Sequence, residues 1–311
     1  MQLLRHDDWF AFSLVLAKAR ELGLTPSRSG QALRTGRTYL VGLWIPHLQT
    51  QFSGSVVGQM QQHLNSRGFD VIVRNVDAMD SVPDYSHRNS PWAVEGVLIV
   101  DPPEGVIESL KDTMGRDMPV VNMGGNYVTS IDYVGIDNYW GAAKATEHLV
   151  KDAGCRKIAF ALNEASVTLR RTRYEGVINT ARDLGVEVTP LILKNGTMAE
   201  AWHATNEYLA SHGYPDGVFC SNDSIALAVQ SALLRHGIKI PDETAMVGCD
   251  GLEFTEFLPV TLTTLELPTS EMCEKAFSFL LNRIEQKSLP KQEAVIKPRL
   301  IVRESSSRTR R

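Results

Sequence analysis

The feature that most constrains the fold of this chain is a repeated alternation of short apolar runs with longer stretches of helical spacing. Short β-branched runs are typical of buried strands, and apolar residues at three- and four-residue intervals are typical of helices. The expected strands are Tyr39–Ile45, Asp70–Val73, Gly96–Val100, Val120–Asn122, Lys157–Ala161, Pro190–Leu193, Gly217–Cys220, Ala245–Cys249 and Ala294–Val302. The expected helices are Ser53–Arg67, Trp140–Ala153, Leu169–Leu184, Met198–His212, Asp223–Arg235 and Ser270–Lys287. This order predicts an α/β fold with mostly parallel sheets and helices on both faces.

A length of 311 residues exceeds one ordinary α/β lobe, so we expect two Rossmann-like lobes behind a short N-terminal helical arm. We assign residues 1–38 to the arm, residues 39–149 with 268–291 to the first lobe, and residues 150–267 with 292–303 to the second. Residues 304–311 are polar and basic, and are expected to form a mobile tail. Residues 77–93 contain Pro83 and Pro91, and are expected to form a loop or a degraded crossover.

Charge is unevenly distributed along the chain. The formal net charge of -4 at pH 7 gives no overall attraction to nucleic acid. The arm is the exception, because its basic residues outnumber its acidic ones: Arg5, Lys18, Arg20, Arg28, Arg34 and Arg37 against Asp7, Asp8 and Glu21. Any affinity for DNA is therefore expected to reside in the arm.

The motifs of several function classes are missing from the sequence. Cys155, Cys220, Cys249 and Cys273 are far apart and have no neighbouring His, so we expect buried thiols rather than a zinc site or a redox pair. There is no P-loop, GxGxxG, HExxH or GxSxG motif, so we expect a protein that is not an enzyme and needs neither metal nor cofactor. No run reaches the roughly 18 apolar residues of a membrane span, and the first residues do not form a secretion signal, so we expect a cytoplasmic protein.

Polar side chains follow several of the apolar runs. Asp137, Asn222 and Asp250 each come directly after such a run, and Arg173 lies near the start of a helix that follows one. Ligands of parallel sheets bind beyond the carboxyl ends of the strands. Carboxylates, an amide and a guanidinium suit a polyhydroxylated or heterocyclic small molecule. Asp137 and Asn222 are also typical helix N-caps, so capping is the alternative role for these two residues.

An ordered set of motifs resembles the LacI/GalR family of bacterial transcription regulators. The motifs are VGIDNYWGAAKATEHL from Val134, GCRKIAFA from Gly154, RYEG from Arg173, SND from Ser221, IPDE from Ile240, VGCD from Val247, LTT from Leu262 and, upstream, ALRTGRT from Ala32. Together they cover about residues 14–303. The resemblance implies a periplasmic-binding-protein-like core of type I whose lobes bind a small effector, which is a sugar, a nucleobase or a similar metabolite.

The resemblance also implies roles for individual residues. It implies effector contact by Asp137, Arg173, Asn222 and Asp250. Phe52 stands where the family often has an aromatic residue that covers the ligand. Met198 stands where some sugar-responsive members have a stacking aromatic residue, and Gly251 replaces the second residue of the family's Asp-Asp pair, which argues against sugar stacking at that wall. Trp140 is a further candidate for the cleft, although an aromatic residue at helical spacing more often belongs to the core.

The arm resembles the end of the family's DNA-binding headpiece. Residues 13–22 match its last helix, and residues 26–33 match the hinge helix, which in the family wedges a leucine into the minor groove. The resemblance assigns this wedge to Leu33 and places Arg28, Arg34 and Arg37 near DNA phosphates. Residues 1–12 are too few for both helices of a helix-turn-helix, so we expect an incomplete DNA-reading headpiece.

These expectations favour a homodimeric transcription regulator in which closure of the lobes on an effector alters binding to operator DNA. One alternative is a small-molecule-binding protein of the same fold that has lost sequence-specific DNA binding. Another is a sugar-binding protein of the periplasmic type. The expected cytoplasmic location and the hinge-like residues 32–38 argue against the periplasmic alternative.

Overall fold

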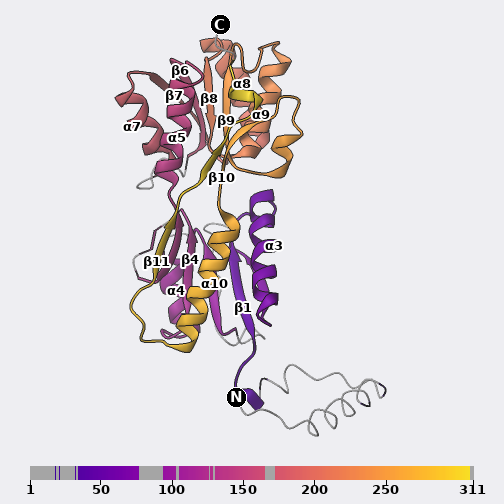
Figure 1. Cartoon of the computed structure of the whole chain (residues 1–311), viewed down its shortest axis with the longest axis vertical. Coiled ribbons are helices and arrows are strands. Elements are labelled where there is room, and N and C mark those ends of the chain that lie inside the picture. The colour runs from indigo at the N-terminus through magenta and orange to yellow at the C-terminus, as the bar shows by residue number, and fades with distance from the viewer. Residues whose placement is uncertain are drawn as a thin grey trace.

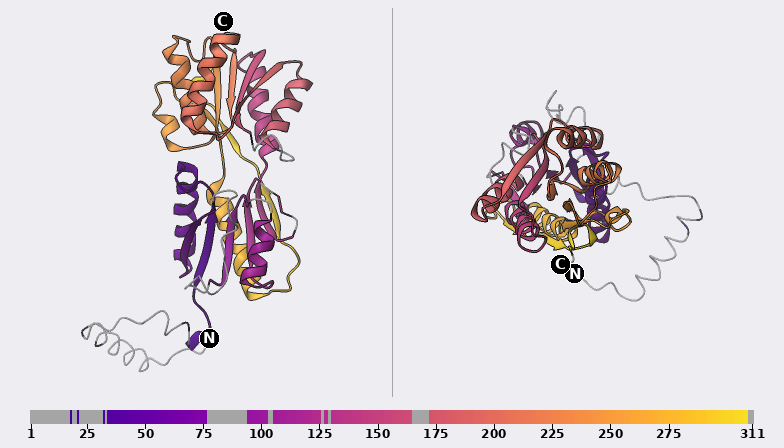
Figure 2. Two further views of the ribbon diagram at one scale, coloured as in Figure 1. Left: turned by 180° about the vertical axis from the view of Figure 1, so that it is seen from behind. Right: turned by 90° about the horizontal axis from the view of Figure 1, so that it is seen from above.

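The structure is a computed structural model, and it describes residues 34–76, 94–102, 105–125, 127–128, 130–164 and 172–308, together with Lys18, Glu21 and Ala32. The loop expected over residues 77–93 and most of the arm lie outside these ranges. The described residues form two lobes stacked along the long axis of the molecule, as Figure 1 shows. The view from behind in Figure 2 shows that narrow segments of chain join the lobes.

Lobe 1 contains a six-stranded sheet, all of whose strands are parallel, in the order β11-β5-β4-β3-β1-β2. Its elements are β1 (Leu40–Ile45), α3 (Gln51–Ser66), β2 (Asp70–Asn75), β3 (Gly96–Val100), α4 (Val106–Met114), β4 (Val120–Gly124), β5 (Asp132–Ile136), α10 (Thr269–Glu285) and β11 (Glu293–Ile296). Alternate residues of each strand face opposite sides of the sheet. Val41, Leu43 and Ile45 pack with α3 and α10, whereas Trp44 packs with α4.

Lobe 2 contains a second six-stranded sheet in the order β12-β10-β9-β8-β6-β7, with β12 antiparallel to β10 and the other pairs parallel. Its elements are α5 (Asn138–Lys151), β6 (Lys157–Asn163), α7 (Arg173–Asp183), β7 (Glu187–Leu193), α8 (Met198–His212), β8 (Gly217–Cys220), α9 (Asp223–Arg235), β9 (Ala245–Asp250), the 3-10 helix η1 (Glu253–Glu256), β10 (Thr263–Glu266), β12 (Arg299–Ile301) and the 3-10 helix η2 (Glu304–Ser306). Phe160 and Phe219 stack beneath α5 and α7, while Ala159 and Val218 face α8 and α9. The two lobes confirm the predicted α/β fold.

Two of the three expected boundaries between the lobes are wrong. Helix α5 packs against α7, β9 and β12, so lobe 2 begins after β5 rather than at residue 150. The single strand expected over residues 294–302 is two strands, because β11 pairs with β5 in lobe 1 whereas β12 pairs with β10 in lobe 2. Pro298 separates the two strands, since proline has no N–H to donate to a ladder. The chain therefore crosses between the lobes after β5, after β10 and after β11.

The tail expected to be mobile from residue 304 is ordered as far as the structure describes it, to Arg308. Ser305 and Ser306 are buried, and the Ser305 hydroxyl donates to the Met246 carbonyl at 2.8 Å. The Arg308 guanidinium donates to four backbone carbonyls at 2.6–3.2 Å: those of Ala153, Asp216, Pro241 and Glu243. The expectation is therefore wrong for residues 304–308, because these contacts fasten the C-terminal segment to lobe 2.

Replacing Arg308 by alanine is expected to lower the free energy of unfolding by about 1–3 kcal/mol, because carbonyls that accept from a charged donor lose that donor. Urea unfolding followed by circular dichroism measures the change. Arg235→Ala is the control, since Arg235 is exposed and has no side-chain partner among the described residues. Equal stability of the two variants would show that the Arg308 contacts contribute nothing.

Candidate functional site

A cavity of about 270 Å³ lies between the lobes, beyond the carboxyl ends of both parallel sheets. We call it the cleft cavity. Its polar lining consists of His47, Thr50, Ser53, Asp101, Asn138, Arg173, Asn222, Ser224 and Asp250. Its apolar lining includes Ile45, Val100, Ile136, Leu267 and one aromatic ring, that of Phe52. The combination of an apolar wall with a few polar groups from different elements is typical of a small-molecule site.

The lobe 1 wall is built from residues that follow β1, β3 and β4. Asp101 comes directly after β3, and its carboxylate lies against Gly124 so closely that a Cβ at Gly124 would be 2.4 Å from Asp101 Oδ1. A Cβ at Gly125 would likewise be 2.4 Å from Asn138 Nδ2. Glycine at both positions therefore makes room for the two polar side chains. Phe52 lies in the first turn of α3, next to Thr50, which caps that helix by accepting from the Ser53 N–H at 3.3 Å.

The lobe 2 wall is built at two helix starts and one strand end. Arg173 is the first residue of α7, and Asp250 is the last residue of β9. Asn222 caps α9, because its Oδ1 accepts from the Ile225 N–H at 2.7 Å. Within the described residues the Nδ2 group of Asn222 has no protein partner, so it is free to donate to a ligand. Capping and ligand binding are therefore compatible roles for this residue.

The electrostatics of the lobe 2 wall favour a ligand with hydrogen-bond acceptors. Burial tends to lower the pKa of Arg173, but neighbouring Cys249, Asp250 and Asp101 outweigh it, and the pKa lies above its ordinary value. The guanidinium is therefore charged. Its Nε is buried and has no hydrogen-bond partner in the described part of the chain. A buried donor without an acceptor costs free energy, and an acceptor atom of a ligand would remove this cost. Burial raises the pKa of Asp250 well above its ordinary value, although Arg173 lowers it.

A buried carboxylate supports the loop behind Asp250. Asp223 is fully buried and accepts from the Leu252 N–H at 2.8 Å and from the Thr264 hydroxyl at 2.7 Å. These bonds fix the start of the loop that follows β9, and with it the end of the strand that carries Asp250. Asp223 does not line the cleft cavity, so its role is to hold the wall in place.

The structure brings together four of the seven residues considered for effector contact: Phe52, Arg173, Asn222 and Asp250. The other three do not line the cavity. Asp137 caps α5 by accepting from the Trp140 N–H at 3.0 Å, and the neighbouring Asn138 lines the cavity instead. The Trp140 ring lies beside the hinge, 5.2 Å from Lys297 Nζ. Met198 is half exposed at the start of α8, and Gly196 forms the nearby part of the wall.

Six polar lining residues were not expected from the sequence: His47, Thr50, Ser53, Asp101, Asn138 and Ser224. A signal for Asp101 was present, because it directly follows the apolar run Gly96–Val100, as Asp250 follows its own run. Asn138 and Ser224 stand beside residues that the sequence singled out. His47 has no comparable sequence signal, because its position depends on the turn between β1 and α3.

Of the four residues expected to contact DNA, two lie outside the described residues. Arg28 and Leu33 lie outside the described residues. Arg34 is exposed. The Arg37 guanidinium is bound to Glu95, with Nη2 at 2.7 Å and Nε at 3.1 Å from the same carboxylate oxygen, and lies over the Tyr39 ring. Arg37 therefore anchors the arm to lobe 1 in this structure.

Comparison with known proteins identifies the chain. The family profile described as "Periplasmic binding protein-like domain" matches residues 146–306, just over half of the sequence. The HTH-type transcriptional repressor PurR of Pasteurella multocida is 24% identical over 297 residues, which cover 94% of this chain and 88% of that protein. The ribose operon repressor of Halalkalibacterium halodurans is 28% identical over 294 residues, covering 94% and 87%. The chain belongs to the LacI/GalR family. A LacI-family regulator from Enterococcus faecium, solved with bound ribose, shares the fold with a TM-score of 0.76 at 21% identity, covering 87% of this chain and all of that one.

In the described parts of the chain, no three or more His, Cys, Asp or Glu side chains converge as a metal site would require. All four cysteines are free and buried, which confirms the expectation of buried thiols. No helix among the described residues has the length and apolar character needed to cross a membrane.

Proposed function

We propose that this LacI/GalR regulator binds a small polar effector, a sugar or a related metabolite, in the cleft cavity. The observation that carries the proposal is the convergence of Arg173, Asn222 and Asp250 from lobe 2 opposite Asp101 from lobe 1. Neighbouring hydroxyl groups suit this set, because carboxylates accept from them while the guanidinium and the amide donate to them. The single aromatic wall at Phe52 allows one face of a ring to pack. Relatives described as a ribose operon repressor and as a regulator with bound ribose make ribose the first effector to test.

The proposed mechanism is closure of the lobes about the three hinge segments. An effector held by both walls stabilises a closed arrangement in proportion to its extra contacts in that form. In a symmetric homodimer, closure moves the ends of lobe 1 relative to each other, and the arms leave from these ends. Effector binding would thus change the distance between the two arms, and with it their affinity for operator DNA. We expect this regulation to take place in the cytoplasm. Arg34 and Arg37 are the described arm residues for phosphate contact, and Arg37 would exchange Glu95 for DNA.

Thermal unfolding with a panel of D-ribose, other pentoses, disaccharides and adenine tests the effector proposal. A true effector at 100 times its Kd adds about 2.7 kcal/mol of stability, which raises the Tm by several degrees. Small-angle scattering should then show a smaller radius of gyration with that ligand. A ligand that binds tightly without changing the scattering curve would contradict closure.

The regulatory part of the proposal has its own test. A gel shift against the chain's own promoter, with and without the effector, should show a change in affinity for DNA. Tight effector binding with unchanged DNA binding would favour the alternative of a binding protein without sequence-specific DNA recognition. We also infer a role in binding rather than in catalysis, since the curated relatives are described as repressors. Recovery of a chemically altered effector after incubation would contradict that inference.

A further inference from the structure

A second cavity lies at the other end of the lobe 1 sheet. Its volume is about 320 Å³, and we call it the base cavity. It is lined by the amino end of β4 at Val120 and of β5 at Asp132, whereas the cleft cavity is lined by the carboxyl ends of the same strands at Gly124 and Ile136. Four strand residues rise roughly 13 Å, so the two cavities are separate sites.

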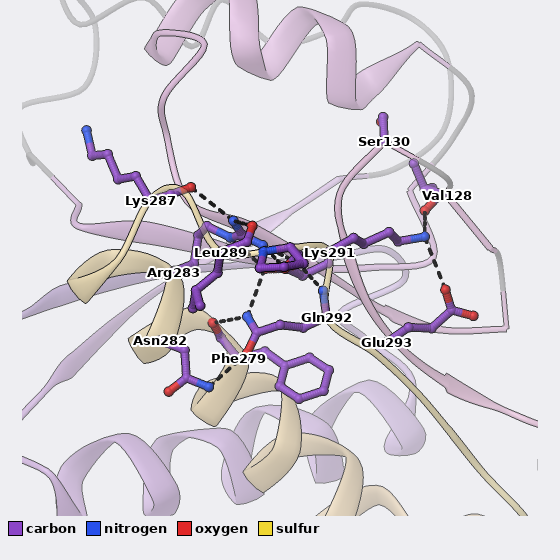
Figure 3. Close-up of polar contacts among 12 residues, drawn as sticks. Val128, Ser130, Phe279, Asn282, Arg283, Lys287, Leu289, Lys291, Gln292 and Glu293 are labelled. Carbon is purple, nitrogen blue, oxygen red and sulfur yellow. Dashed lines mark hydrogen bonds and ion pairs between the residues drawn. The ribbon is translucent and has the colours of Figure 1, made fainter.

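The floor of the base cavity is a closed ion-pair network. Arg283 Nε and Nη2 donate to the two carboxylate oxygens of Asp132 at 3.0 and 2.8 Å. The same guanidinium donates to three carbonyls of the loop after α10, those of Lys287, Leu289 and Pro290. Figure 3 shows Arg283 beside Lys287 and Leu289. Burial tends to raise the pKa of Asp132, but the bonds from Arg283 and Gln292 outweigh it and lower the pKa. Both charges of this pair are therefore already compensated.

The rim of the base cavity carries basic charge that is not compensated. Arg116 and Lys287 are exposed, and neither has a side-chain partner within the ranges that the structure describes. Figure 3 shows the Lys287 amino group pointing away from the floor network. Lys111 donates to a neutral group, the Ser130 carbonyl, at 3.3 Å. One acidic rim residue, Asp117, opposes these three cations.

Lys291 completes the rim but contributes little free charge. Its Nζ lies 3.3 Å from the Glu293 carboxylate and 2.9 Å from the Tyr127 hydroxyl. The remaining rim therefore carries a net excess of two positive charges in a chain whose formal net charge is -4. Apolar side chains also line the base cavity, namely Met118, Ile131 and Leu289.

We propose that the base cavity binds an organic phosphate monoester. A phosphate monoester carries about -1.5 to -2 charges at pH 7, which matches the excess on the rim. Arg116 can bind phosphate oxygens with a planar fork of donors, while Lys111 and Lys287 act as point charges. The apolar side chains would pack against the carbon skeleton. This site goes beyond the proposed function, because it is separate from the effector site and needs none of its residues.

The position of the base cavity links it to the arm. A neighbouring cavity shares Asp117, Met118 and Lys287 with it, and is also lined by Gly36 and Arg37, where the arm enters lobe 1. A phosphate bound at Lys287 would therefore lie beside the Arg37–Glu95 pair. DNA held by the arm is a second source of phosphate at this place, but a concave site with apolar walls favours a small molecule.

Isothermal titration with glucose 6-phosphate at low ionic strength tests the proposal, with glucose and inorganic phosphate as comparison ligands. Glucose 6-phosphate should bind at least about tenfold more tightly than either, because both the charge and the carbon skeleton contribute. The double variant Arg116→Gln/Lys287→Gln should weaken its binding at least about tenfold. The control Arg67→Gln/Arg235→Gln removes the same charge from exposed residues outside the cavity and should bind as the parent does.

Four results would overturn the proposal. Unchanged binding by the Arg116→Gln/Lys287→Gln variant would place the phosphate elsewhere, and so would loss of binding in Arg173→Leu, which would place it in the cleft cavity. Inorganic phosphate binding as tightly as glucose 6-phosphate would show a general anion site. Weakened binding of a labelled DNA duplex by the double variant, without any binding of glucose 6-phosphate, would assign the rim to DNA. Because the two cavities have separate variants, failure of either proposal leaves the other standing.

Discussion

Replacing Arg283 by methionine is expected to lower the free energy of unfolding by about 3–5 kcal/mol, the range typical of a buried ion pair that loses one partner. The Asp132 side chain is 2% exposed and would keep its bonds from Gln292 but lose both bonds from the guanidinium. Three carbonyls of the loop after α10 would lose a donor as well. Urea unfolding followed by circular dichroism, with the parent protein alongside, measures the loss.

The pH dependence of this variant separates the ion pair from general packing. In the parent the pKa of Asp132 is lowered below 3.8, so the pair contributes stability above that pH and loses it as the pH falls through the lower, folded-state value. In the variant the bonds from Arg283 that lower the pKa of Asp132 are gone, while burial still raises it. The Asp132 carboxyl therefore takes up a proton at a higher pH than in the parent. The difference in stability between parent and variant should therefore be largest at neutral pH and shrink below about pH 4. A difference that stays constant with pH would assign the loss to packing.

A double variant, Arg283→Met/Asp132→Asn, gives a further control. It removes both charges, so it leaves no buried carboxylate without its partner. Its cost should be clearly smaller than the sum of the two single costs, as expected for residues in direct contact. Additive costs would mean that Arg283 and Asp132 stabilise lobe 1 independently of each other.

The layered fold was predictable because its signal is local. The period of two along β1 and the apolar spacing of α3 depend on residues within one segment, and both elements are where the sequence placed them. Short elements such as α4, β5 and β10 were not predicted from the sequence. A segment of four to nine residues contains too few repeats for its hydrophobic period to be recognised. Two of the lobe boundaries were predicted wrongly for a different reason. Which sheet a strand joins is decided by distant partners, and no feature within residues 294–302 says that β11 and β12 pair in different lobes.

The site shows the same limit at the level of single side chains. A polar residue after an apolar run is placed at the correct end of the sheet, and Asn222 and Asp250 line the cleft cavity accordingly. The rule cannot tell which way the side chain turns. Asp137 satisfies it, yet its carboxylate turns to the N–H of Trp140, while the adjacent Asn138 faces the cavity. Helix capping and ligand binding use the same residue types, so the backbone geometry decides between them.

The Arg173→Leu variant is expected to bind the effector at least about 100-fold more weakly without losing stability. Two hydrogen bonds from a charged donor account for a loss of this size. The buried Nε of Arg173 has no hydrogen-bond partner in the described chain, so its removal leaves no protein acceptor unpaired at that atom. Burial raises the pKa of Asp250 and Arg173 lowers it, so without Arg173 the pKa rises further and the carboxyl takes up a proton more readily.

The measurements are titration calorimetry with the ligand found in the panel, beginning with D-ribose, and thermal unfolding without ligand. Asn222→Asp is the matched variant, because aspartate keeps the oxygen that caps α9 but lacks the Nδ2 donor, so it should weaken binding while leaving the helix capped. Asn222→Ala should weaken binding and also cost about 1 kcal/mol of stability through the lost cap. If Arg173→Leu unfolded at a much lower temperature than the parent, the guanidinium would be a structural group of lobe 2. If it bound the effector as the parent does, the effector would have to sit away from the lobe 2 wall.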